Sequence, residues 1–156
     1  MAKILKIITD PNPILRNISE PVENEDINDP KMIDFTEDMK KTMLEKDGVG
    51  LAAPQVGENI RLIVVNTKDG VLPMFNPQIT KRSFGKYWEQ EGCLSLPMVF
   101  GDVKRCKKIT CIYRNIKGEK IELKAEGLLA RIIQHEVDHL NGILFTDRAK
   151  RIHKEE

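Results

Sequence analysis

Two histidines and a glutamate near the C-terminal end of the chain have the spacing of a metal site. His135 and His139 stand four residues apart, and Glu136 directly follows the first histidine. In an α-helix, positions i and i+4 lie on one face, one turn apart, so both imidazoles can reach one metal ion. In this H-E-x-x-H arrangement the glutamate handles the protons of a water that the metal activates. The pattern therefore predicts a hydrolytic metal site.

The sequence around these residues predicts a helix over about residues 126–141. Apolar residues recur there at helical spacing, namely Leu128, Leu129, Ile132, Ile133, Val137 and Leu140. Asn141 and Gly142 provide a stop, because both tolerate a left-handed C-cap. Two structural histidines on a half-buried helix are the alternative. The glutamate between two histidines at metal spacing favours the metal site.

A third ligand is expected upstream of this helix. In an H-E-x-x-H-x-x-G pattern a third histidine would follow three residues after Gly142, but Phe145 occupies that position. The only glutamates further on are Glu155 and Glu156, at an end of the chain that we expect to be frayed. The best upstream candidate is Cys93.

Composition and charge exclude several classes of function. The 156 residues suffice for one domain with one core, and 40% apolar and 31% charged residues are ordinary for a globular protein. A formal net charge of +1 gives no support for direct DNA binding or for a trap for acidic substrates. No stretch approaches a transmembrane span, and the N-terminus lacks a long apolar signal core. We therefore expect a cytoplasmic protein without a membrane partner.

The three cysteines are Cys93, Cys106 and Cys111. An odd count in a chain without a signal sequence argues against a disulfide framework. Cys106 and Cys111 lie in a strand-like run over residues 103–113, where we expect them to be small packed side chains.

The order of predicted elements indicates an α+β fold. A helix is expected over residues 30–46, with Asp29 as its N-cap, followed by a strand over 61–66 and extended stretches over 71–80 and 84–90. A hairpin is expected from 103–115 and 120–124, turning at 115–118, before the C-terminal helix. Strands and helices do not alternate, so we predict a single domain over residues 1–156 with mainly antiparallel sheets around the H-E-x-x-H helix.

The basic tail after Arg148 is expected to be solvated rather than to contact RNA.

A loop rich in glycine and alanine lies over residues 48–57. Its small residues allow a ligand or a neighbouring strand to approach the backbone closely. It has neither the G-x-G-x-x-G spacing nor the lysine of a P-loop, so a nucleotide site is not supported. Gln55 is its one long polar side chain.

Three stretches in this order and spacing resemble the signature motifs of the peptide deformylase family. They are Gly48-Val49-Gly50-Leu51-Ala52-Ala53-Pro54-Gln55, Glu91-Gly92-Cys93-Leu94-Ser95 and Gln134-His135-Glu136-Val137-Asp138-His139. The resemblance implies an α+β fold with the H-E-x-x-H helix packed on antiparallel sheets. It also implies removal of the formyl group from the N-terminal formyl-methionine of newly synthesised peptides, with release of formate.

The resemblance further implies roles for individual residues. Cys93, His135 and His139 would be metal ligands, Glu136 the catalytic acid and base, and Gln55 with the backbone N–H of Leu94 the donors to the oxyanion. The implied metal is Fe²⁺, with Zn²⁺, Ni²⁺ or Co²⁺ as substitutes. The implied partners are N-formylmethionyl nascent peptides, and the ribosome near the tunnel exit is a candidate partner, although the tail is shorter than in relatives that dock there through an extended helix.

Substrate selectivity requires an apolar pocket for the methionine side chain. Candidates for its walls and for contacts to the peptide backbone are Gly48, Val49, Gly50, Leu51, Ile132 and the Cys93–Leu94 segment. Arg131 occupies a helix position where many relatives are apolar. It either rims the pocket or extends to solvent, and we expect the second. The Met98–Gly101 segment lacks an arginine that some relatives carry there, which leaves a backbone contact in that region open.

A metallopeptidase and a non-enzymatic metal-binding module are the two alternatives to a deformylase. A small zinc metallopeptidase would share the H-E-x-x-H helix, but Phe145 stands where its third ligand would be, and Cys93 lies in a glycine-containing motif. A non-enzymatic metal-binding or ribosome-associated module would not need Glu136. A purely structural site normally has four protein ligands, and the sequence offers no clear fourth.

Overall fold

A strand that is buried on both faces lies at the centre of the computed structural model, which describes residues 1–155. Strand β2 (Leu62–Thr67) begins with four apolar residues that are all 0% exposed. Successive side chains of a strand point to opposite faces of the sheet. Accordingly, Leu62 and Val64 pack into one core cluster, while Ile63 and Val65 pack into another. The uninterrupted apolar run is explained by this burial on both sides.

The strands form two sheets in which every pair of neighbouring strands is antiparallel. The five-stranded sheet has the order β1-β2-β3-β6-β7, with β1 (Gly50–Ala52), β3 (Gly70–Arg82), β6 (Lys108–Arg114) and β7 (Lys120–Glu126). The three-stranded sheet has the order β4-β5-β8, with β4 (Lys86–Cys93), β5 (Leu96–Cys106) and β8 (Lys150–Lys154).

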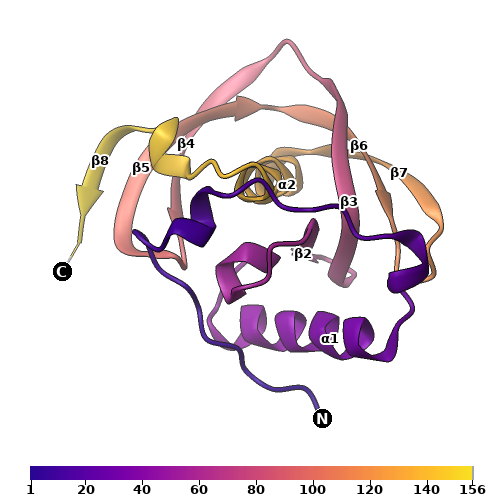
Figure 1. The fold of residues 1–156 in the computed structure, drawn as a ribbon. Helices are drawn as coiled ribbons and strands as arrows, with labels where there is room; N and C mark the ends of the chain where they lie inside the picture. The colour runs from indigo at the N-terminus through magenta and orange to yellow at the C-terminus, as the bar shows by residue number, and fades with distance from the viewer. Residues whose placement is uncertain (156) are drawn as a thin grey trace.

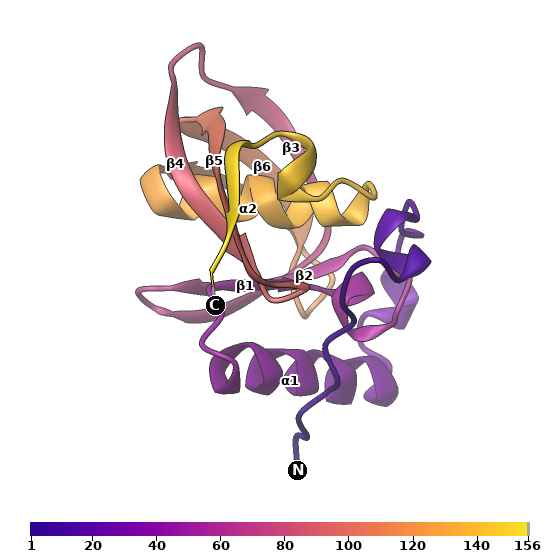
Figure 2. The same ribbon diagram turned by 90° about the vertical axis from the view of Figure 1, so that its left-hand side faces the viewer.

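The two α-helices cover different faces of the five-stranded sheet. Helix α2 (Gly127–Leu140) is enclosed by the strands, whereas α1 (Pro30–Glu45) lies outside them, beyond β2 (Figure 1). The view turned by 90° shows β1 and β2 between the two helices (Figure 2). Short 3₁₀ helices complete the fold: η1 (Pro13–Arg16), η2 (Asn24–Asp26), η3 (Ala53–Val56) and η4 (Phe145–Asp147). No helix within residues 1–155 has the length and apolar character needed to cross a membrane.

This architecture confirms the predicted α+β fold and both predicted helices. Asp29 caps α1, since its carboxylate accepts a hydrogen bond from the N–H of Lys31 at 2.9 Å. The β6–β7 hairpin turns at the expected place, where the N–H of Gly118 donates to the carbonyl of Asn115. Cys106 and Cys111 are buried, unpaired and packed into the core cluster beside α2, also as expected.

Two expectations about the strands are wrong. Residues 103–115 do not form one strand, because the chain passes from β5 in one sheet to β6 in the other at Lys107. The N–H of Lys107 donates to Gly85, and its carbonyl accepts from Gly127. The end of the chain, expected to be frayed, is paired up to Glu155: β8 pairs with β5, and the N–H of Glu155 donates to the carbonyl of Met98. The β8 residues are exposed, which agrees with the expected solvated tail. Glu156 lies outside the described residues.

Gly142 ends the metal-site helix where the chain needs a left-handed residue. Its φ is +73°, as the predicted C-cap requires, and the following N–H, of Ile143, donates to the carbonyl of Asp138 at 2.9 Å. A Cβ at this position would overlap the backbone carbonyl of Arg16. The absence of a side chain therefore allows the N-terminal segment to pack against the helix end.

Replacing Gly142 with alanine should destabilise the protein by about 3 kcal/mol, because a left-handed backbone and a steric overlap with rigid backbone both add cost. Gly57→Ala is the matched control: φ there is +93°, but a Cβ would meet nothing within 4 Å. The control should lose only about 1–2 kcal/mol. Urea unfolding monitored by circular dichroism measures both, and equal losses would contradict the steric argument.

Candidate metal and active site

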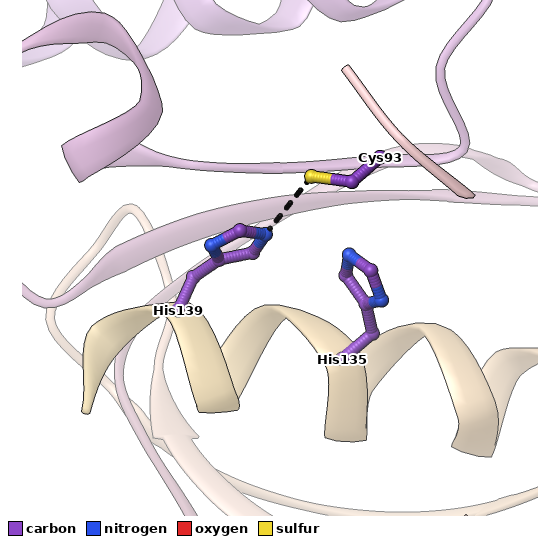
Figure 3. Close-up of side chains that lie close together, drawn as sticks. All are labelled: Cys93, His135 and His139. Atoms are coloured by element: carbon purple, nitrogen blue, oxygen red, sulfur yellow. Dashed lines mark hydrogen bonds between the residues drawn. The ribbon is translucent and has the colours of Figure 1, made fainter. Parts of the chain in front are cut away.

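Three potential metal ligands converge from two elements. Cys93 is the last residue of β4, whereas His135 and His139 project from successive turns of α2 toward its sulfur (Figure 3). Their ligand atoms all lie within 4.8 Å of one another, and Nε2 of His139 is 3.3 Å from Sγ of Cys93. The structure thus brings together the three residues that the sequence analysis selected.

A carboxylate from β4 fixes the orientation of the first histidine. Nδ1 of His135 is 2.8 Å from Oε1 of Glu91, which leaves Nε2 directed to the cluster. Metal-bound histidines usually donate their second N–H in this way. Burial alone would raise the pKa of Glu91, but hydrogen bonds from Arg105 and His135 outweigh it and hold the pKa well below its usual range. Glu91 is therefore a charged acceptor.

The donor set suits a divalent transition metal. One sulfur and two imidazole nitrogens bind zinc, iron and related ions, and three protein ligands leave a position for water or substrate. Burial and the charge of His135 hold the pKa of His139 well below its usual range, which favours the neutral ring that a metal needs. The pKa of His135 is raised: burial lowers it, but hydrogen bonds with Cys93 and Glu91 outweigh burial. A bound ion would take the place of that proton.

Glu136 stands beside the three ligands with an unused oxygen. Glu136 is 3% exposed, and its Oε1 atom has no hydrogen-bond partner within residues 1–155. Burial raises the pKa of Glu136 to about 7, the range in which a carboxylate both accepts and returns a proton near neutral pH. An unpartnered buried oxygen is costly in a purely structural role. Its position therefore favours a role in proton transfer.

Gln55 directs its amide group at the same cluster. Its Oε1 accepts from the N–H of Ala52 at 2.9 Å, which turns Nε2 toward Sγ of Cys93 at 3.4 Å and Oγ of Ser95 at 3.1 Å. The N-terminal segment supports this arrangement, since the N–H of Ile8 donates to the Gln55 carbonyl at 2.7 Å. Leu94 directly follows Cys93 in the turn between β4 and β5.

A cavity of about 650 Å³ opens beside these groups. Cys93, His135, Glu136 and Gln55 line it, together with the predicted substrate-binding residues Gly48, Val49, Gly50, Ile132 and Leu94. Val49 is 52% exposed, whereas Ile132 is nearly buried. Met98, Val99 and Phe100 contribute apolar wall on the other side. A mainly apolar cavity with a few convergent polar groups is the usual form of a small-molecule or peptide site.

The Leu51 side chain does not line this cavity, so that part of the expected pocket is wrong. Leu51 is 0% exposed and packs into the core cluster beneath α1. The alternation of β1 explains the difference: Gly50 faces α2, where a Cβ would meet Glu136 and Ile132, and Leu51 therefore points to the opposite face.

The expectation that Arg131 extends to solvent is also wrong, and the alternative agrees with the structure, since Arg131 is among the residues that line the cavity. Arg131 is 2% exposed, and its guanidinium donates to Oε2 of Glu91 at 2.6 Å. Arg105 joins the same carboxylate and reaches Asp138 on α2 at 2.8 Å. No sequence motif predicts a role for Glu91, Arg105 or Asp138. A usable signal existed for Arg105, since it shares the inward face of β5 with Val103, two residues away.

A buried carboxylate beside a cluster of one cysteine and two histidines is an arrangement typical of hydrolases that work with a metal ion. Comparison with known proteins identifies the family within this class of hydrolase. A model of the polypeptide deformylase family matches residues 4–155. Peptide deformylase of Carboxydothermus hydrogenoformans is 46% identical over 149 residues, covering 96% of this chain and 95% of the relative. Peptide deformylase 1 of Bacillus anthracis is 44% identical, covering 97% and 96%.

Solved structures of similar fold also belong to peptide deformylases. A class I type b peptide deformylase from Acinetobacter baumannii with bound Met-Ala-Ser superposes with a TM-score of 0.91 at 38% identity, covering 95% of this chain and 99% of that one. The Thermotoga maritima peptide deformylase gives a TM-score of 0.90 at 39% identity, covering 94% and 98%. This chain belongs to the peptide deformylase family, whose members remove the formyl group from N-formylmethionyl peptides. The resemblance noted in the sequence is confirmed, and the metallopeptidase alternative is not supported.

Replacing Gly50 with alanine should lower formate release about 100-fold, because small displacements of reacting groups have effects of this size. The new Cβ would lie 2.6 Å from Oε2 of Glu136 and 2.9 Å from Cγ2 of Ile132. Gly85→Ala is the control, since its φ is not positive, it lies outside the cavity, and its Cβ would meet only the flexible side chain of Lys107 at 3.5 Å. Steady-state assays at matched metal content measure both, and similar activities would argue against displacement of Glu136.

Proposed function

We propose that the chain, as a single catalytic domain over residues 1–156, hydrolyses the formyl group of N-terminal formyl-methionine with Cys93, His135 and His139 as metal ligands and Glu136 as the acid and base. The observation that carries these assignments is the unpartnered, buried Oε1 of Glu136 beside three ligand atoms within 4.8 Å of one another. Such a group has a clear use where a proton must leave water and reach an amine.

We propose Fe²⁺ as the ion, with Zn²⁺, Ni²⁺ or Co²⁺ as substitutes. When bound to Cys93, His135 and His139, such an ion would supply a Lewis acid, which lowers the pKa of a water and polarises a carbonyl oxygen. The ligand chemistry of one cysteine and two histidines accepts several of these ions, so the choice of iron follows from the resemblance to the family. A ferrous ion on a thiolate should make Cys93 sensitive to oxygen.

The proposed proton transfers use only Glu136. Its carboxylate accepts a proton from the attacking water and then delivers that proton to the nitrogen of the methionine as the C–N bond breaks. The products are formate and a free N-terminal amine. Because Glu136 is buried, bulk water has little access to its carboxylate. Its pKa of about 7 allows it both to accept a proton and to release one at neutral pH.

Gln55 and Leu94 are the proposed donors to the negative charge that develops on the formyl oxygen. The Gln55 amide is held by Ala52 and needs no reorientation, since Nε2 already points at the cluster. Leu94 directly follows the proposed cysteine ligand and lines the same cavity, which supports its N–H as the second donor. Each such donor contributes about 3 kcal/mol to lowering a barrier of this type.

The cavity provides a proposed place for the peptide. Val49 and Ile132 give apolar surface for the methionine side chain, next to the Cys93–Leu94 segment. Strand β1 lies at the edge of its sheet within residues 1–155, so its outer edge is a proposed place for the peptide to pair as an added strand. The A. baumannii relative, whose structure holds Met-Ala-Ser, supports a tripeptide of this kind as a ligand.

We also propose that the protein acts in the cytoplasm on nascent peptides near the ribosomal tunnel exit. Formylated N-termini belong to chains that have just been made, so the substrate class supports this location. The described cysteines form no disulfide within residues 1–155, which agrees with a reducing compartment.

The first test is formate release from formyl-Met-Ala-Ser by protein purified without oxygen, with metal content measured on the same sample. Wild type should release formate, and Glu136→Ala at equal metal content should be slower by about 1,000-fold, because it lacks the proton acceptor. Unchanged turnover by the variant would remove Glu136 from the mechanism. No release by fully metallated wild type would contradict the proposed activity.

A second test concerns the pocket. Val49→Asp should lower the preference for formyl-Met over formyl-Gly peptides by about tenfold or more, because a charge replaces apolar wall. Ile116→Asp is the matched control, since Ile116 is 54% exposed, close to the 52% of Val49, but lies in the β6–β7 turn. Ratios of kcat/KM for the two peptides give the preference. If Val49→Asp keeps the wild-type ratio, the pocket lies elsewhere.

A further inference from the structure

Arg131 joins the helix that carries both histidines to the sheet that carries the cysteine. It lies one turn before His135 on α2 and is almost completely buried. Nη2 donates to the carbonyl oxygen of Tyr87 on β4 at 2.8 Å, and Nη1 donates to that of Val103 on β5 at 2.9 Å. The guanidinium also lies over the Tyr87 ring, 4.6 Å from its centre. One side chain thus contacts two strands of the three-stranded sheet.

The same guanidinium completes the hydrogen bonding of Glu91. Nη1 of Arg131 donates to Oε2 at 2.6 Å, whereas Nδ1 of His135 meets Oε1 at 2.8 Å. Arg105 spans the carboxylate, with Nε donating to Oε2 at 2.8 Å and Nη2 to Oε1 at 2.9 Å. Two residues from neighbouring turns of α2 therefore hold the two oxygens of one carboxylate, and the carboxylate cannot rotate without breaking one of these bonds.

Stability alone does not account for an arginine at this position. Arg105 already forms a two-point ion pair with Glu91, so a second arginine is not needed to neutralise its charge. Burying a guanidinium costs several kcal/mol, and buried ion pairs often give no net stability relative to apolar residues of similar volume. Nε of Arg131 is in addition without a hydrogen-bond partner in the described chain, residues 1–155. The geometry therefore calls for a more specific role.

We propose that Arg131 is a positioning residue for the metal site. Through Glu91 it keeps the His135 ring turned so that Nε2 faces the sulfur of Cys93. Through the carbonyls of Tyr87 and Val103 it fixes the distance of α2 from β4, the strand that ends in Cys93. The inference rests on the proposed metal site and adds to it a residue that is not itself a proposed ligand of the ion.

Three variants separate this role from a general effect on folding. Arg131→Met removes the guanidinium but keeps a long apolar side chain. Arg131→Lys keeps the charge, although one ammonium group cannot reproduce the planar fork that meets Glu91 and both carbonyls. Arg148→Met is the matched control, because Arg148 also bonds a carboxylate of α2, with Nε 2.7 Å from Oδ2 of Asp138, and none of its described bonds reaches Glu91.

The experiment is a titration of each metal-free protein with Co²⁺ under argon, in competition with a chelator. The ligand-field and thiolate-to-cobalt absorption bands report the geometry of the site. Arg131→Met should bind Co²⁺ roughly 10–100-fold more weakly, as is typical when a group that orients a ligand is lost, and its bands should shift. Arg131→Lys should fall between Arg131→Met and wild type, and Arg148→Met should match wild type. Thermal unfolding of the metal-free proteins accompanies every titration.

Several results would overturn the inference. Wild-type affinity and unchanged bands in Arg131→Met would do so, whatever happens to formate release. Equal weakening in Arg131→Met and Arg148→Met, with equal losses in Tm, would show a general structural effect instead. If Arg131→Met does not fold, unchanged bands and affinity in Arg131→Lys decide against the role. Failure of wild type to bind Co²⁺ would remove the metal site itself, and this outcome is distinguishable because it does not depend on Arg131.

Discussion

The buried carboxylate of Glu91 is the contact on which the rest of the site depends. It belongs to β4, accepts hydrogen bonds from Arg105 on β5, and meets His135 and Arg131 on α2. A buried charge is tolerable only when its partners stand at hydrogen-bonding distance. Helix α2 and the three-stranded sheet must therefore pack in one relative position for Glu91 to be buried with its partners. Burial of apolar side chains favours the packing of α2 on the sheet, and the hydrogen bonds of Glu91 fix their relative position.

The enclosure of α2 between two sheets explains why its polar residues all have specific partners or uses. Every residue from Ala130 to Leu140 is buried, so the helix has no solvated face along most of its length. Gln134 shows how this is managed: its Oε1 accepts from the N–H of Cys106 at 3.1 Å, and its Nε2 donates to the carbonyl of Cys106 at 3.0 Å. Its amide thus pairs with β5 much as a neighbouring strand would. Three buried side-chain polar atoms of α2 have no partner within residues 1–155: Nε of Arg131, Oε1 of Glu136 and Nδ1 of His139, and the last two belong to the proposed metal site.

Local patterns were sufficient to predict the features that depend on neighbours in sequence. The i, i+4 spacing placed His135 and His139 on one face of a helix, and the caps at Asp29 and Gly142 were read from single residues. Cys93 is the best upstream candidate because no third ligand follows His139, and the resemblance of the motifs supports this choice.

Features decided by distant contacts were missed. Arg131 looks like a solvent-exposed helix residue, and its partners Val103, Glu91 and Tyr87 are 28, 40 and 44 residues away. The break at Lys107 has neither glycine nor proline to mark it, because it arises from the passage between two sheets. The tail reads as polar and becomes a strand only because the edge of β5 is available to pair with it.

The wide separation of the site residues along the chain has a consequence for how the molecule comes to hold an ion. Gln55 and Cys93 are 38 residues apart, and Cys93 and His139 are 46 apart. Contacts of such long range form late in folding, after the loops between them have closed. No fragment that lacks α2 has more than one of the three proposed ligands. Binding of an ion at the proposed site would therefore be a late event that stabilises only completed molecules, and incompletely folded chains would gain nothing from the metal.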